Sequence, residues 1–257
     1  MYTVAVQVVY QRLPVCQATN LDAPGTGAES TKAVLLLASA SPRRRELLAL
    51  LGLPFEVTVA DVDEDPLADE SPATLVARLS QAKACAACSS TRCTPTGLTG
   101  VPTGIVIACD TVVALNGELL GKPRDATEAI AMLRRLGGRF HDVYSAVTLL
   151  EPATSRALTD VARTQVAMRA YSDDEIAAYI ASGDPLDKAG AYAIQHAGFH
   201  PVAENQGCYA NVVGLPLCHL TRGLRTWKIE PLRHVPTACQ AHTGRECKVY
   251  AGILNGQ

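Results

Sequence analysis

The sequence lacks an excess of charge of either sign: it contains 23 lysines and arginines and 25 aspartates and glutamates, which give a net charge of −2. No global basic field therefore attracts a nucleic acid polymer, although a monomeric nucleotide or a small phosphate ester remains a suitable ligand. The sequence also lacks an apolar run of the roughly 18 residues that cross a bilayer, and its start lacks the basic segment and apolar block of a secretion signal. We expect neither a nucleic acid polymer nor a membrane as a partner.

The nine cysteines are an odd number, and some lie in apparent core segments such as residues 105–109. This favours reduced thiols and a cytoplasmic protein. Cys85, Cys88 and Cys93 form a C-x2-C-x4-C pattern, but no matching Cys or His pair follows at the spacing of a zinc finger. A structural zinc ion is therefore the weaker interpretation of this cluster.

The chain has 257 residues, of which 48% are hydrophobic, and contains no internal repeat or low-complexity block. This length allows one large domain or two small ones with a sizeable core. Residues 1–32 pass into a small, polar, Gly-containing stretch and read as an N-terminal extension and linker. Residues 228–257 show no clear periodicity and read as a C-terminal tail. The sequence thus predicts one domain over residues 33–227.

The most informative stretch covers residues 35–48, LLLASASPRRRELL. An apolar strand ends at two serines, after which Ser41 can cap a helix and Pro42 suits its first position. Free backbone N–H groups at such a helix start favour an anion, and the arginines there oppose the helix macrodipole unless a negative partner is present. A solvated arginine cluster is the alternative.

A second informative stretch is the apolar strand 105–109, which runs directly into Asp110 and Thr111. A carboxylate in such a strand is costly unless it is paired, hydrogen-bonded or metal-bound. An aspartate satisfied by backbone amides would be a purely structural explanation. Asn116 and Gly117 then predict a hairpin turn that returns through residues 118–123.

Caps and hydrophobic periodicity predict the other elements. The predicted strands cover 55–59, which is followed by the acidic run 61–65, and the regions near 141–150 and 156–169, which we expect to pair antiparallel. The predicted helices cover 71–89, with Lys83 near the end, 125–136, 172–182 and 217–227. The charged, Gly-containing loop 184–195 is of a kind that often carries function.

Four separated motifs agree with one family. Residues 37–48 (LASASPRRRELL), 110–123 (beginning DTVV and ending GKP), 183–195 (GDPLDKAGAYAIQ) and 211–217 (NVVGLPL) closely resemble the Maf nucleotide pyrophosphatases. One such motif is modest evidence, but four in order are strong. The resemblance implies an α/β fold related to the house-cleaning inosine triphosphate pyrophosphatases, with an extended mixed sheet, flanking helices and a cleft between two lobes.

The same resemblance implies hydrolysis of a nucleoside triphosphate to the monophosphate and pyrophosphate with Mg²⁺ or Mn²⁺. By position, Asp110 would be the catalytic base and a metal ligand, and Glu64 the second metal ligand. The remaining matched positions would bind substrate: Ser39, Arg43, Arg44, Lys83, Thr111, Lys122, Lys188 and Gln195. Cationic side chains over the phosphates and a metal held by carboxylates suit phosphoryl transfer. A homodimer is compatible with the resemblance, but the sequence does not determine the oligomeric state.

Three positions, Arg43, Thr111 and Gln195, resemble the branch of the family that acts on dTTP and UTP, and on modified pyrimidine triphosphates. A Gln amide offers both a donor and an acceptor to a pyrimidine edge, although it could equally bond only to the backbone. The alternatives are a 7-methyl-GTP or purine-directed activity, which resembles a branch with Trp after the Ser-Pro pair, and a nucleotide-binding regulator of cell division with little catalysis.

Departures from the family pattern are Cys109 before the Asp, Ala193 before the Ile-Gln pair, and the run 196–200.

Overall fold

The computed structural model describes residues 7–13, 34–90 and 104–256. Within them, eight strands form one sheet: β1 (Gln7–Arg12), β2 (Val34–Ala38), β3 (Phe55–Thr58), β4 (Gly104–Leu115), β5 (Glu118–Leu120), β6 (Phe140–Glu151), β7 (Arg156–Met168) and β8 (Val202–Gln206). The helices are α1 (Pro42–Ala49), α2 (Pro72–Ser90), α3 (Ala126–Leu136), α4 (Asp173–Ala181), α5 (Tyr209–Val213), α6 (Leu217–Arg225), α7 (Val235–Thr243) and α8 (Tyr250–Leu254), with 3-10 turns η2 (Asp184–Asp187) and η3 (Ala189–Ala191).

The sheet is mixed. Its order is β1-β7-β6-β4-β2-β3, with β5 on β4 and β8 on β7. β2 pairs parallel with β3 on one side and with β4 on the other, whereas β4, β6 and β7 pair antiparallel. The predicted α/β fold with a mixed sheet and flanking helices is confirmed. The chain leaves β2 toward β3 and later returns to its other side at β4, and such a switch point is where ligands bind in open α/β sheets.

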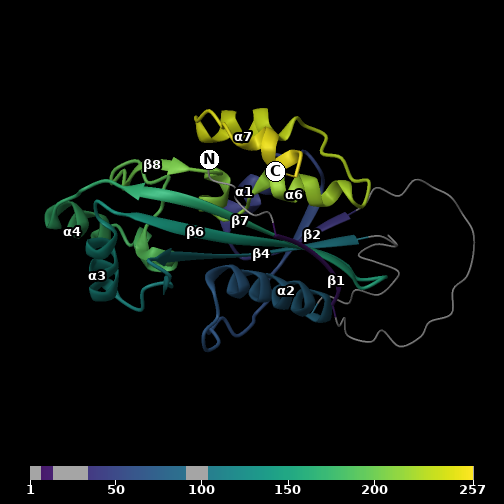
Figure 1. Cartoon of the computed structure of the whole chain (residues 1–257), viewed down its shortest axis with the longest axis horizontal. Helices are drawn as coiled ribbons and strands as arrows, with labels where there is room; N and C mark the ends of the chain where they lie inside the picture. Colours follow the sequence, from purple (N-terminus) through teal and green to yellow (C-terminus); the bar gives the residue numbers. More distant parts are fainter. Residues whose placement is uncertain (1–6, 14–33, 91–103, 257) are drawn as a thin grey trace, which may run out of the picture.

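Helices cover both faces of this sheet. Figure 1 shows α2 over one face, α6 and α7 over the other, and α3 and α4 at one end. Because strand side chains alternate, Ile105, Ile107 and Cys109 of β4 pack toward α1 and α6, whereas Val106 and Ala108 pack toward α2.

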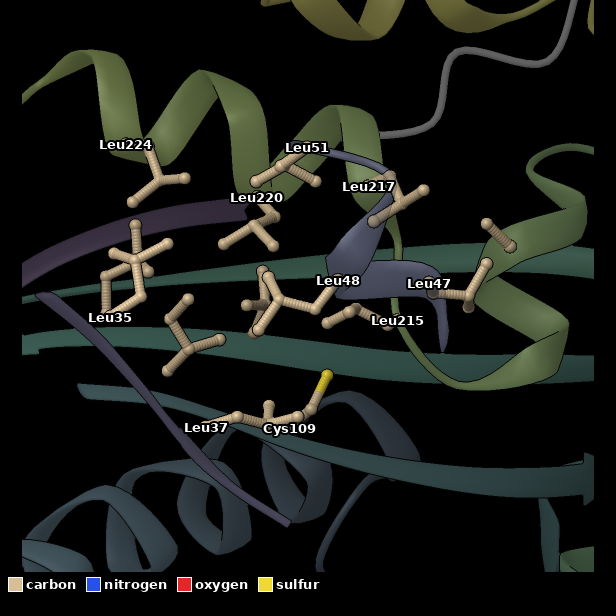
Figure 2. Packing of buried hydrophobic residues seen from close by; sticks show 14 of the residues in the cluster. Leu35, Leu37, Leu47, Leu48, Leu51, Cys109, Leu215, Leu217, Leu220 and Leu224 are labelled. Carbon is tan, nitrogen blue, oxygen red and sulfur yellow. The ribbon is translucent and has the colours of Figure 1, made fainter. Parts of the chain in front are cut away.

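The core on the α6 side consists mainly of leucines. Figure 2 shows Leu217, Leu220 and Leu224 of α6 turned toward leucines of β2 and α1. Leu47 and Leu48 are fully buried there, together with Leu51, as the apolar spacing of this stretch predicts. This packing anchors the short α1, so that its first turn is held in place beside the end of β2.

Both ends of the chain contribute helices or strands among the described residues. The expected N-terminal extension contributes β1, which pairs antiparallel with β7; the linker expected within residues 14–33 lies outside the described residues. The expected C-terminal tail contains α7 and α8. Arg222 of α6 donates hydrogen bonds to buried Asp160 of β7 and to the carbonyl of Ile253 in α8. Because Val235 is also buried in the core, much of this segment packs on α6 rather than extending from the domain.

Candidate active site

A cleft of about 720 Å³ opens at the carboxyl end of β2, beside the second half of β4. It is also bordered by α2, the β3 end, β5 and the 3-10 turns. Every site residue predicted from the sequence lines it: Ser39, Arg43, Arg44, Glu64, Lys83, Asp110, Thr111, Lys122, Lys188 and Gln195. The fold thus brings residues from six separate segments into one cavity. No single sequence motif is enough to predict that these segments meet.

The cleft exists because β2 is shorter than its neighbour. β2 ends at Ala38, opposite Ala108, whereas β4 continues to Leu115. From Cys109 to Val112, β4 therefore pairs with β6 on one edge and has no strand partner among the described residues on the other, where β5 begins to pair at Val113. Asp110 is the second residue past this point, and its alternation turns it toward the α2 face.

Lys83 of α2 joins the two carboxylates of the site. Its Nζ lies 2.6 Å from Asp110 Oδ1 and 2.5 Å from Glu64 Oε1. Lys83 and Asp110 are both buried, whereas Glu64 is about half exposed and is also 3.3 Å from Lys122 Nζ. Asp110 thus has a buried cation as its partner, and the purely structural explanation, satisfaction by backbone amides alone, does not describe it.

Burial would disfavour the charged form of Glu64, but hydrogen bonds and charges from Lys83 and Lys122 outweigh it, so the pKa of Glu64 lies below its usual value. Glu64 is therefore ionised at neutral pH. The other carboxylate, that of Asp110, accepts a hydrogen bond from Lys83 at Oδ1.

The start of α1 forms the opposite border. Ser39 Oγ accepts a hydrogen bond from the N–H of Ser41, and Ser41 Oγ accepts one from the N–H of Arg44, as expected for a helix cap. The partly exposed Arg43 lies 3.9 Å from Asp187 across the cleft. Its guanidinium and the helix start thus face the cavity, an arrangement suited to an anion.

Arg44 has quite different surroundings from Arg43. Its Nε donates to the carbonyl of Gly214 (2.9 Å), Nη1 to the carbonyl of Cys109 (2.8 Å) and Nη2 to Thr111 Oγ1 (3.0 Å). All three guanidinium nitrogens therefore already bind protein groups.

The loop with the 3-10 turns closes the far side. Lys188 is buried, and its Nζ binds the carbonyl oxygen of Asp184, Asp184 Oδ1 (3.0 Å) and Asp187 Oδ1 (2.5 Å). Tyr179 donates to Asp184 Oδ2 at 2.7 Å and accepts from the N–H of Ala193. The ammonium of Lys188 has three N–H donors, so these three acceptors account for all of them. Gln195, by contrast, is exposed at the cleft.

Sequence reasoning missed two buried polar residues behind the cleft. Ser145 of β6 bonds to Thr111 Oγ1 (2.8 Å) and donates to the carbonyl of Asn211, while Asn211 Nδ2 donates to Thr164 Oγ1 (2.9 Å). Ser145 could have been predicted, because it is a hydroxyl residue in β6, a strand otherwise rich in buried apolar residues. Asp187 was missed as well, although it lies in a loop marked as functional.

The described residues hold no group of three His, Cys, Asp or Glu side chains arranged for a metal ion. Cys85 and Cys88 lie on α2, and Cys93, the third member of the cysteine cluster, lies outside the described residues. In the same described part, no helix is long and apolar enough to cross a bilayer.

The mixed sheet and the cleft, with cations beside two acidic side chains, are those of an α/β enzyme that acts on a small anionic substrate. The comparisons with known proteins agree. The model of the family described as Maf-like protein matches residues 34–227. The chain belongs to this family.

Several relatives carry the name dTTP/UTP pyrophosphatase. That of Myxococcus xanthus is 53% identical over 184 residues, 72% of this chain and 87% of the relative. That of Anaeromyxobacter dehalogenans is 47% identical over 193 residues, 74% and 92% of the two chains. That of Geotalea uraniireducens is 43% identical over 196 residues, 76% and 95% of the two. The similarity therefore extends over nearly the whole of each relative.

Proposed function

We propose that this chain hydrolyses dTTP and UTP to the nucleoside monophosphate and pyrophosphate, and that residues 33–227 carry this activity. The observation that carries the proposal is the pair of carboxylates, Asp110 and Glu64, held by Lys83 in a cleft that Ser39 and Arg43 border from the opposite side. The names of the relatives supply the nucleotides. The odd number of cysteines, several of them in the core, supports the cytoplasm as its location.

In this mechanism Asp110 is the general base. It accepts a proton from a water molecule whose oxygen attacks the α-phosphorus, the bond from that phosphorus to the bridging oxygen breaks, and pyrophosphate leaves. The buried Lys83 lies 2.6 Å from Asp110 Oδ1 and orients its carboxylate. Arg43 and Lys122 neutralise the charge of the triphosphate and the serine loop donates hydrogen bonds to it, since positioning and charge provide most of the catalysis in phosphoryl transfer.

A divalent cation fits the donor set. Mg²⁺ and Mn²⁺ prefer oxygen ligands, and Mg²⁺ is commonly held by one or two carboxylates together with substrate phosphates, so a third protein ligand is not required. Asp110 and Glu64 share the Lys83 ammonium and therefore lie near one another, and both residues line the cleft. When bound, the cation would neutralise charge on the phosphate oxygens.

Base selection is proposed for a further side chain of the cleft. Gln195 is exposed there and can both donate to and accept from a pyrimidine. Arg43 and Thr111 complete the set, Thr111 by shaping the cleft wall, because its hydroxyl is already bonded to Arg44 and Ser145.

The test is pyrophosphate release from a panel of dTTP, UTP, purine triphosphates and 7-methyl-GTP with Mg²⁺ or Mn²⁺. We expect the highest kcat/KM for dTTP and UTP, and loss of release after chelation of the metal. Asp110→Asn should lower kcat by at least about 100-fold while the protein stays folded. Orthophosphate as the first product would contradict the proposal. Nucleotide binding by an inactive wild type would favour the regulator instead, and a preference for 7-methyl-GTP or a purine triphosphate would favour that branch of the family.

A further inference from the structure

Arg44, the third residue of α1, connects this helix with two other parts of the chain. It reaches the carbonyl of Gly214, which follows α5, and both neighbours of Asp110 on β4: the carbonyl of Cys109 and the hydroxyl of Thr111. Two of its three contacts thus flank the proposed catalytic base by one residue on either side.

These contacts replace a missing strand. Beyond Ala108, β4 has lost β2 as its neighbour, so the carbonyl of Cys109 has no strand to donate to it on that edge. An unpaired carbonyl in such a position is costly, and Nη1 of Arg44 supplies the bond at 2.8 Å. The guanidinium therefore extends the hydrogen bonding of the sheet past the end of β2.

Arg44 and the two carboxylates lie on opposite faces of β4. Successive side chains of a strand alternate, so Thr111 points away from the face on which Asp110 meets Lys83. Thr111 is further bonded to Ser145, which donates to the carbonyl of Asn211. Arg44 thus belongs to a polar network that contacts β4 on the face opposite to Asp110.

The backbone at Gly214 is shaped for this contact. Its φ is +116°, and a Cβ there would lie 3.3 Å from Arg44 Nε and 3.4 Å from Thr111 Oγ1. A side chain at this position would therefore crowd the guanidinium and strain the backbone at the same time. Within the part of the chain that the structure describes, the neighbouring Arg43 has no comparable set of bonds, and its ion pair with Asp187 is long, at 3.9 Å.

We infer that Arg44 is a positioning residue that fixes Asp110 through the backbone of β4, and that Arg43, not Arg44, is the arginine that binds the triphosphate. This inference rests on the proposed function for its kinetic part. A planar guanidinium can satisfy three acceptors in a fork that the compact ammonium of lysine cannot reproduce. Arg44→Lys therefore keeps the charge and loses the geometry.

The experiment compares Arg44→Lys with Arg43→Gln, a neighbour in the same helical turn, by two readouts. Pyrophosphate release gives kcat and KM for dTTP. Calorimetry gives the Kd for thymidine 5′-triphosphate with a methylene group between the α- and β-phosphorus, which cannot be cleaved there. Because a small displacement of a reacting group costs about 100-fold, Arg44→Lys should lose about that factor in kcat. Its Kd should stay within about 3-fold, whereas Arg43→Gln should raise Kd by about 10-fold or more.

Retained kcat in Arg44→Lys, or a Kd raised as much as in Arg43→Gln, would overturn the inference. Far-UV circular dichroism checks the fold, and if Arg44→Lys does not fold, Thr111→Val replaces it: this variant removes one acceptor of Arg44 and should lower kcat at an unchanged Kd. If the wild type releases no pyrophosphate, the proposed function fails, but the Kd values still decide whether Arg44 or Arg43 binds the phosphates.

Discussion

Lys83 and Lys122 offer a direct test of how the acidic centre is stabilised, because both lysines pair with Glu64 but only one is buried. The side chain of Lys83 is 10% exposed and contacts Asp110, whose side chain is 9% exposed, whereas Lys122 is 59% exposed. Removing one partner of a buried pair leaves an uncompensated charge. We therefore expect Lys83→Met to lower the free energy of unfolding by about 3 to 5 kcal/mol.

The matched control is Lys122→Met, which removes a solvent-screened contact at 3.3 Å and should cost no more than about 1 kcal/mol. The double variant Lys83→Met with Asp110→Asn should recover most of the loss, since the buried charge is then removed together with its partner. Urea unfolding followed by the fluorescence of Trp227, the single tryptophan, measures all four proteins. Equal losses in the two lysine variants, or no recovery in the double variant, would refute the reasoning.

Three further outcomes are expected. Gly223→Ala should destabilise the protein by about 1 to 3 kcal/mol despite the better helix propensity of alanine, because the new Cβ would lie 2.6 Å from Leu149 Cδ1 in the core; chemical denaturation measures it. The lowered pKa of Glu64 means that its stabilisation is complete above the ordinary value of 4.5 and is lost as the pH falls through its lower folded value, so Glu64→Gln should flatten the acid limb of a plot of unfolding free energy against pH. Burial lowers the pKa of His219 from 6.5 to about 4, so the unfolded chain takes up a proton first and stability falls as the pH drops between these values. His219→Leu should reduce that slope in thermal melts, and an unchanged slope would show that other groups cause it.

The sequence predicted the parts of the site that have local signals. The end of β2, the serine cap and the first turn of α1 follow from capping chemistry, and Asp110 stands out because a carboxylate is rare in an apolar strand. The family motifs selected the lining residues, which all meet in the cleft.

The roles of neighbouring arginines could not be predicted in the same way. Successive helical residues point about 100° apart, so Arg43 and Arg44 face different surroundings, which only the packing of β4 and Gly214 against α1 decides. For similar reasons, α5 escaped prediction. A helix of five residues is too short to be stable without the tertiary contacts around it. The helices after residue 228 lack the periodicity that reveals an amphipathic helix.

The early end of β2 has a consequence for how this enzyme can change. The cleft arises because β2 ends at Ala38, four residues after its pairing with β4 begins at Val34. It therefore requires no cavity within the hydrophobic core, where the leucines of β2, α1 and α6 stay closely packed. Folding stability and substrate choice are therefore separable: the loops around the gap can lengthen, shorten or exchange side chains while the sheet below is unaffected. One scaffold can in this way accept new bases by variation at its rim.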